Sequence, residues 1–145
     1  GGKCKIGIES TVIDLSYEPK ILRPGIIDKI SIERVLKKKL KKNVKKIKKM
    51  SPGMMKKHYS PGIPIIFNKK PLNLSHAYIV FGKKYDLKKN YFNLSKKANL
   101  TEAAANLYST MRKIKKNGYK KIFVSKIPRS GPGIAINDRL YRASK

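Results

Sequence analysis

The chain has 145 residues, enough for one ordinary domain or for a small domain with part of another. Its 36 Lys and Arg residues oppose 8 Asp and Glu, and the net charge of +28 favours acidic partners such as nucleic acid or nucleotide phosphates. Hydrophobic residues make up 40% of the sequence, which is sufficient for a folded core. A single cysteine, Cys4, excludes an internal disulfide framework and favours a reducing compartment, so we expect a cytoplasmic location.

The ends and the apolar runs of the chain bear on membranes and processing. The longest apolar runs, such as 77–81, fall far short of the roughly 20 residues that cross a bilayer, so we expect no membrane partner. The chain opens Gly1-Gly2-Lys3, without an initiator Met or an apolar leader. We therefore expect it to be part of a longer polypeptide.

The basic charge allows two interpretations. Only 6 of the 36 basic residues are arginine, and such a lysine skew arises in AT-rich coding sequence without any selection for binding. The densest run, Lys37 to Lys49, has 9 lysines in 13 positions. Runs of this kind are usually a solvated face or a linker and only sometimes a contact surface. Compositional background and a binding surface both remain open.

The N-terminal residues predict a hairpin. The segment from Ser10 to Leu15 is β-branched and apolar enough for a strand, and Ile21 to Arg23 is a partner across the turn formed by 16–20. Because an antiparallel hairpin brings the start of one strand beside the end of the other, we expect the Ser10 hydroxyl and the Arg23 guanidinium to meet.

A short helix and a linker are predicted next. Asp28 is suited to cap a helix whose apolar positions Ile32, Val35, Leu36 and Leu40 follow helical spacing. From about residue 41 to 62 this spacing fades, and two Ser-Pro-Gly triplets interrupt the chain. These features indicate a linker and a domain boundary.

The remaining sequence alternates strands and helices. Apolar runs predict strands at 63–67, 77–81, 91–94 and 120–127, and apolar stripes predict helices from Asn99 to Gly118 and from Ile134 to Ala143. Asn99 followed by Glu102 is typical of a capping box. This order favours an α/β layer with parallel strands, roughly Rossmann-like in organisation.

Few side chains suit metal or phosphate chemistry. His58 and His76 lie far apart and lack the spacing of metal ligands, so no metal site is expected. The loop Ser130–Gly133 precedes a helix and offers backbone N–H groups to an anion. It lacks the glycine pattern of a dinucleotide fingerprint or a P-loop, which favours a structural turn.

Several motifs together resemble a known family. They are Gly7-Ile8-Glu9-Ser10-Thr11-Val12-Ile13-Asp14-Leu15, Ile21-Leu22-Arg23-Pro24-Gly25, Ser51-Pro52-Gly53-Met54, His58-Tyr59-Ser60-Pro61 and Ala135-Ile136-Asn137-Asp138-Arg139-Leu140. In this order and spacing they resemble the long form of the YrdC family, the Sua-type threonylcarbamoyl-AMP synthases. The resemblance extends over essentially the whole chain.

The resemblance implies three parts and an activity. Residues 1–40 correspond to the tail of a YrdC-type α/β catalytic domain, 41–62 to a linker, and 63–145 to a small Rossmann-like C-terminal domain. Members of the family condense L-threonine, bicarbonate and ATP into threonylcarbamoyl-AMP and pyrophosphate. The product is passed to the machinery that makes threonylcarbamoyladenosine at position 37 of tRNA.

The same resemblance assigns site residues. Ser10 is expected to hold the threonine-derived part, while Arg23 and Tyr59 bind the ATP nucleotide. Thr11 and His58 are expected to support the site or the linker. ATP enters as a substrate with Mg²⁺, and neither a tightly bound cofactor nor a covalent catalytic residue is expected.

The chain also departs from the family pattern. At Met54 to Tyr59 it replaces a Tyr and an Arg that many members carry, and the N-terminal Lys-Arg and Ser-x-Asn motifs are absent. We therefore expect residues 1–145 alone to be inactive. The alternative is a basic α/β RNA-binding module without catalytic activity, and a third possibility is a C-terminal domain that serves only as structural support for a lid.

Overall fold

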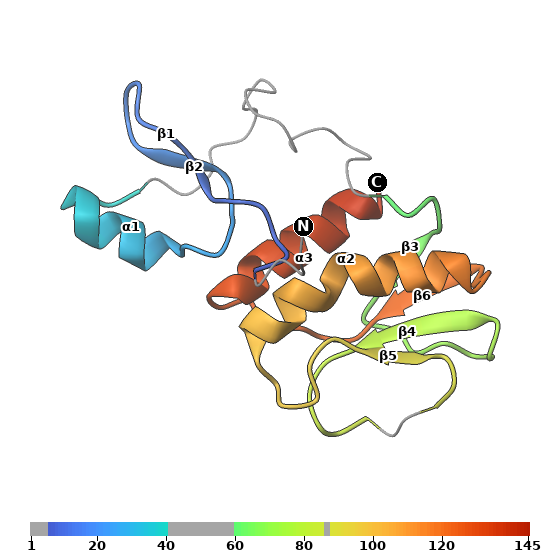
Figure 1. Ribbon diagram of the computed structural model, residues 1–145. Helices are drawn as coiled ribbons and strands as arrows, with labels where there is room; N and C mark the ends of the chain where they lie inside the picture. The colour runs from blue at the N-terminus through green and yellow to red at the C-terminus, as the bar shows by residue number, and fades with distance from the viewer. Residues whose placement is uncertain (1–5, 41–59, 86–87) are drawn as a thin grey trace, which may run out of the picture.

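A computed structural model describes residues 6–40, 60–85 and 88–145 of the chain (Figure 1). In chain order the elements are β1 (Val12–Asp14), β2 (Lys20–Arg23), α1 (Lys29–Leu36), β3 (Ile65–Phe67), β4 (His76–Val80), β5 (Tyr91–Asn93), α2 (Leu100–Lys116), β6 (Lys121–Val124) and α3 (Pro132–Ala143). Within these ranges no helix combines the length and the apolar character needed to span a membrane.

The four later strands form one parallel sheet in the order β3-β6-β4-β5. Helices α2 and α3 both lie over the same face of this sheet (Figure 1). Side chains on β4 alternate between the faces: Ala77 and Ile79 join the core beneath the helices, whereas Tyr78 and Val80 pack on the opposite face. The predicted α/β class with parallel pairing is confirmed.

The predicted capping box at the start of α2 is confirmed and includes a third residue. Asn99 Oδ1 accepts a hydrogen bond from the Glu102 amide at 2.9 Å. The Glu102 carboxylate turns to the Ser95 hydroxyl at 2.6 Å, and that hydroxyl accepts from the Asn99 amide at 3.0 Å. The side chains of Asn99 and Ser95 thus accept from two backbone N–H groups of the helix start, and Glu102 reaches the Asn99 amide only through the Ser95 hydroxyl. The buried stripe of α2 comprises Ala103, Ala104, Leu107, Met111 and Ile114.

Helix α3 begins two residues before the predicted Ile134, because Pro132 occupies the first turn, where its missing N–H costs nothing. The loop ahead of it is held by structural contacts. Gly133 lies so close to the Pro128 carbonyl that a Cβ would overlap it. The Asn137 amide donates to the Gly133 carbonyl at 2.7 Å. These contacts favour the structural interpretation of the loop over anion binding.

The N-terminal hairpin and α1 differ in detail from the prediction. Strand β1 covers only part of the predicted 10–15 segment. Asp28 caps α1 as predicted, by accepting from the Ser31 amide at 2.8 Å. The expected core position of Val35 is wrong, since its side chain is 81% exposed. The helix ends early because Lys37 adopts a left-handed conformation, so Leu40 is buried outside the helix.

The segment ahead of β1 packs against the later domain. Ile8 belongs to the same buried core cluster as the sheet, α2 and α3. Gly7, with φ +63°, lies against the backbone of Ala105 in α2, and a Cβ there would overlap it. The expected division into 1–40, 41–62 and 63–145 stays a prediction, but residues before 40 share a core with residues after 63.

Two glycines with similar backbone angles test this packing. Gly118 has φ +73° and open space around it, so Gly118→Ala should lower the free energy of unfolding by about 1 kcal/mol, the cost of the left-handed backbone. Gly7→Ala has the same backbone cost plus the overlap with α2, which should add about 1 to 3 kcal/mol. Chemical unfolding measures the difference, and equal losses would contradict the packing of Gly7 against α2.

Candidate functional site

The mouth of the hairpin brings Ser10 and Arg23 together, as predicted. Arg23 Nε donates to the Ser10 carbonyl at 3.2 Å, and an Nη atom donates to Ser10 Oγ at 3.4 Å. The backbone register is different from the expected one, because Arg23 pairs with Val12 and an irregularity follows at Val12 and Ile13. The long guanidinium side chain spans the two-residue offset.

The opposite end of the hairpin is held by an ionised carboxylate. Asp14 forms an ion pair with Lys20 at 2.9 Å and accepts a hydrogen bond from the Ser16 amide at 2.9 Å. These interactions, with Lys20 first, lower the pKa of Asp14 to about 2. The hairpin is therefore fixed at its turn as well as at its mouth.

Close packing holds the two sides of the mouth against each other. Gly25 lies so near the backbone of Ser10 and Thr11 that a Cβ would overlap both. The Thr11 hydroxyl donates to the Ile27 carbonyl at 2.8 Å. Thr11 thus ties the mouth together through its side chain, and its expected role in supporting the site stays a prediction.

A buried arginine from α3 reaches the same mouth. Arg139 is 0% exposed. Its Nε donates to the Glu9 carboxylate at 2.9 Å, one Nη to Asp138 at 2.6 Å, and the other Nη to the Pro24 carbonyl at 3.0 Å. Burial of a guanidinium is tolerated only with such complete pairing.

Glu9 is the main acidic partner of this arginine. Burial acts to raise the pKa of Glu9, but hydrogen bonds from Arg139 and Tyr108 and the charge of Arg139 outweigh it, so the pKa lies below its ordinary value. The Tyr108 hydroxyl donates to the carboxylate at 3.1 Å. Glu9 is therefore ionised at neutral pH and bound from both α2 and α3.

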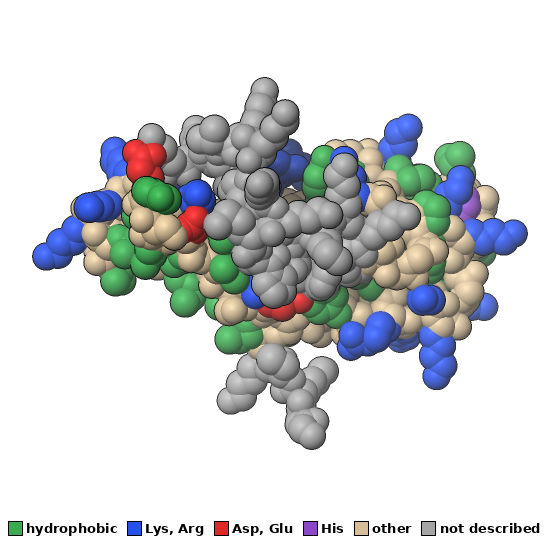
Figure 2. All heavy atoms as spheres, turned by 90° about the horizontal axis from the view of Figure 1, so that it is seen from above, with side chains coloured by type: hydrophobic (Ala, Val, Ile, Leu, Met, Phe, Trp, Pro, Cys, Tyr) green, Lys and Arg blue, Asp and Glu red, His purple; other side chains and the backbone are tan. Residues whose placement is uncertain are grey.

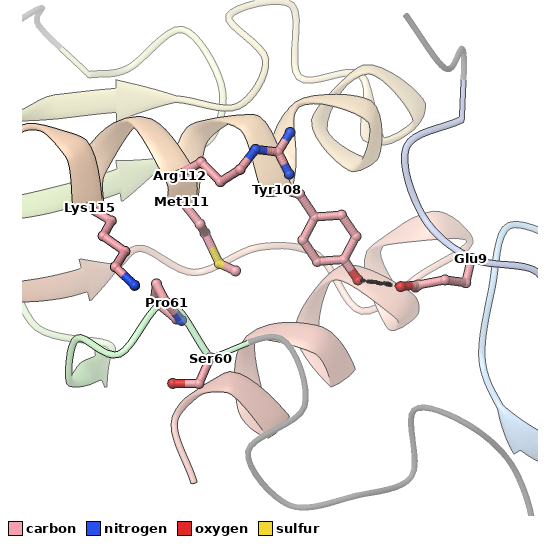
Figure 3. Close-up of a pocket in the computed structure, with 7 residues that line it drawn as sticks. All are labelled: Glu9, Ser60, Pro61, Tyr108, Met111, Arg112 and Lys115. Atoms are coloured by element: carbon pink, nitrogen blue, oxygen red, sulfur yellow. Dashed lines mark hydrogen bonds between the residues drawn. The ribbon is translucent and has the colours of Figure 1, made fainter. Parts of the chain in front are cut away.

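The contacts of Glu9 with Arg139 and Tyr108 form a joint between the N-terminal segment and helices α2 and α3. A pocket of about 390 Å³ adjoins this joint (Figure 3). Figure 3 shows the Tyr108 hydroxyl meeting the Glu9 carboxylate at one end and Met111 pointing into the space. The lining residues are Glu9, Ser60, Pro61, Tyr108, Met111, Arg112 and Lys115. Ser60 follows the expected nucleotide-binding residue Tyr59 directly in the sequence.

Tyr59, His58 and His76 are the remaining residues that the sequence singled out. Tyr59 and His58 lie outside the described residues, so their roles stay predictions. His76 stacks near Phe123 at 5.5 Å between ring centres. Across the described ranges no group of three or more His, Cys, Asp or Glu side chains is placed to hold a metal ion.

Sequence reasoning missed the roles of Glu9, Tyr108 and Arg139. Glu9 and Arg139 each stand inside a motif that the sequence analysis quoted, one in the first and one in the last. A glutamate and an arginine in two motifs with no other role were the available signal for an ion pair. Tyr108 had no such signal, because it occupies an ordinary position on α2.

Comparison with known proteins places the chain in a family. Residues 27–145 match the family described as "Threonylcarbamoyl-AMP synthase, C-terminal domain". The chain belongs to this family. The resemblance noted from the motifs is therefore confirmed.

The relatives agree with this assignment. Threonylcarbamoyl-AMP synthases of Bacillus subtilis (strain 168) and Pyrococcus abyssi (strain GE5 / Orsay) are 32% and 30% identical and align with 99% of the chain. The crystal structure of P. abyssi Sua5 complexed with L-threonine superposes with a TM-score of 0.78 at 29% identity, covering 99% of the chain. The chain spans about half the length of these proteins, 47% and 48% of the two sequences and 48% of the crystallised chain.

The ionised state of Glu9 gives a pH prediction. Because its folded-state pKa is lowered, the carboxylate stabilises the fold fully above its ordinary pKa, and this stability is lost as pH falls through the folded value. Glu9→Gln should therefore lower the free energy of unfolding at pH 7, and this loss should shrink as pH falls through the lowered pKa of Glu9. Denaturant unfolding measured over a series of falling pH values checks this, and a loss independent of pH would contradict it.

Proposed function

We propose that the protein containing this chain is a threonylcarbamoyl-AMP synthase, and that the chain supplies the hairpin mouth and the C-terminal domain. L-threonine, bicarbonate and ATP are its substrates, and threonylcarbamoyl-AMP and pyrophosphate are its products. The observation that carries the proposal is the pairing of the Arg23 guanidinium with Ser10 at one edge of a rigid hairpin. Family membership supports the same activity.

Each step of the reaction needs positioning more than a covalent nucleophile. The threonine amine attacks bicarbonate, water leaves, and the resulting carbamate oxygen attacks the α-phosphorus as pyrophosphate departs. Orientation of the reactants and neutralisation of phosphate charge lower the barrier to both attacks. The contacts at the hairpin mouth supply these two contributions.

The residue roles follow from chemistry as well as from the resemblance. A planar guanidinium binds phosphate oxygens through two parallel hydrogen bonds, which suits Arg23 to the nucleotide phosphate. Ser10 provides a hydroxyl and a carbonyl at the same edge for the threonine-derived part. Tyr59, from the linker, closes over the nucleotide and excludes water that would hydrolyse the acyl-adenylate.

Mg²⁺ enters this scheme as part of the ATP substrate. In nucleotide sites it is held by substrate phosphates with one or two carboxylates, and it retains several waters. The product serves the tRNA-modification machinery, and the reaction takes place in the cytoplasm. Both assignments rest on the family's chemistry.

Removing the guanidinium tests the assignment of Arg23. Arg23→Ala in the whole protein should cost about 2 to 4 kcal/mol of transition-state stabilisation, a loss of about 30-fold to 900-fold in kcat/KM. Pyrophosphate release with ATP, L-threonine and bicarbonate provides the measurement. Lys88→Ala is the matched control, because Lys88 lies beside the Tyr91 ring at 5.9 Å on the far side of the sheet.

The same two variants separate catalysis from RNA binding. Basic side chains are scattered around the outline of the molecule in Figure 2. If the protein were mainly an RNA-binding module, its affinity for RNA would fall steeply with salt, and the two variants would weaken it equally. On the synthase proposal both variants keep nearly the RNA affinity of the unaltered protein, and only Arg23→Ala loses most of the pyrophosphate release.

Residues 1–145 alone should have no activity of their own. Residues 1–145 lack the family's Lys-Arg and Ser-x-Asn motifs, which bind most of the triphosphate. A polypeptide of these residues should therefore release no pyrophosphate above the background rate under conditions in which the whole protein is active. Measurable turnover by the short polypeptide would contradict this assignment of triphosphate binding.

A further inference from the structure

Arg139 contacts both flanks of the hairpin mouth. Its Nε is 2.9 Å from the carboxylate of Glu9, the residue before Ser10. One of its Nη atoms is 3.0 Å from the carbonyl of Pro24, the residue after Arg23. A single side chain of α3 therefore spans the two backbone segments that carry the proposed substrate contacts.

These bonds require an arginine. The three nitrogens of a guanidinium point in three fixed directions, and here they reach Glu9, Pro24 and Asp138. Lysine has one nitrogen on a flexible stem and cannot hold two separated acceptors with the same geometry. Because Arg139 is wholly buried, no water replaces a lost bond directly at the guanidinium.

A shift of Glu9 or Pro24 also displaces the neighbouring residues of the hairpin mouth, Ser10 and Arg23. Gly25 lies against the backbone of Ser10 and Thr11 without room for a Cβ, so the two sides move together. Arg23 in turn bonds to the Ser10 carbonyl at 3.2 Å. Loss of either Arg139 contact therefore loosens both proposed substrate contacts.

We propose that Arg139 is a positioning residue that fixes the spacing of Ser10 and Arg23, so that the C-terminal domain forms part of the substrate site. The proposal rests on the proposed function for the identity of the substrates. The clamp itself, from Arg139 to Glu9 and Pro24, is independent of that identity.

The test compares two arginines of the same ion cluster in the whole protein. Arg139→Lys keeps the positive charge but removes the planar guanidinium, whose nitrogens reach Glu9, Pro24 and Asp138. Arg142→Lys is the matched control, because Arg142 bonds to the same Asp138 oxygen at 2.9 Å through a partly exposed side chain of α3. The readouts are KM and kcat for pyrophosphate release, the melting temperature, and amide hydrogen exchange at residues 10–12, Arg23 and Gly25.

We expect Arg139→Lys to raise KM for L-threonine and ATP about tenfold with little change in kcat, because ordering of the mouth is then required during binding. Amide exchange should quicken at residues 10–12, Arg23 and Gly25 and should remain slow in α2. Arg142→Lys should leave KM and exchange unchanged. Glu9→Gln, a milder change at a partly exposed carboxylate, should shift KM and exchange in the same direction if Arg139→Lys does not fold.

Two results would overturn the proposal. A lower melting temperature with unchanged KM and kcat would show that Arg139 only stabilises the fold. Faster exchange throughout the sheet and α2 would show general loosening in place of a local clamp. If the unaltered whole protein releases no pyrophosphate, the proposed function fails while the exchange comparison still decides whether the clamp exists.

Discussion

A fully buried guanidinium sets the arrangement of this molecule. Arg139 has no contact with solvent, and its charge is balanced by Glu9 and Asp138. Removal of such a charge from water costs several kcal/mol, and close partners with satisfied donors offset that cost. The N-terminal segment must therefore lie against α3, and Tyr108 of α2 completes the contacts to Glu9.

The hairpin mouth owes its geometry to this joint and to its own packing. Ser10 and Arg23 directly adjoin Glu9 and Pro24, the two residues of the hairpin mouth that Arg139 contacts. The ion pair of Asp14 and Lys20 fixes the other end of the hairpin. Reactions that join small polar substrates to a nucleotide gain most from groups already in place before the substrates arrive. In the proposed reaction, a hairpin held at both ends and bound to α3 would meet this requirement without a covalent nucleophile.

Periodicity and capping chemistry predicted most of the fold. The stripe of α2, its Asn99 cap and the buried strands were readable because they depend on neighbours close in sequence. The exposure of Val35 could not be predicted in this way, since it depends on which distant residues cover α1. The contact between Ser10 and Arg23 followed from hairpin topology. The register of the two strands was not predicted, because it depends on an irregularity at Val12 and Ile13 that no local sequence pattern indicates.

The contact between Glu9 and Arg139 was not predictable from periodicity, and only their positions in two motifs gave a signal for it. Glu9 and Arg139 are separated by 130 positions, and periodicity within a helix or strand carries no information about such a pair. The resemblance pointed to the right motifs and to the right family. It did not reveal that the first and last of those motifs bind each other.

The distance along the chain between these partners also orders events during synthesis. Glu9 is translated 130 residues before Arg139, and its carboxylate stays solvated until α3 has emerged, because α3 carries the guanidinium that binds it. The hairpin can form on its own in that interval, since its contacts are local. Its attachment to the rest of the molecule has to wait, which leaves Ile8 uncovered by its core neighbours until α2 and α3 have formed.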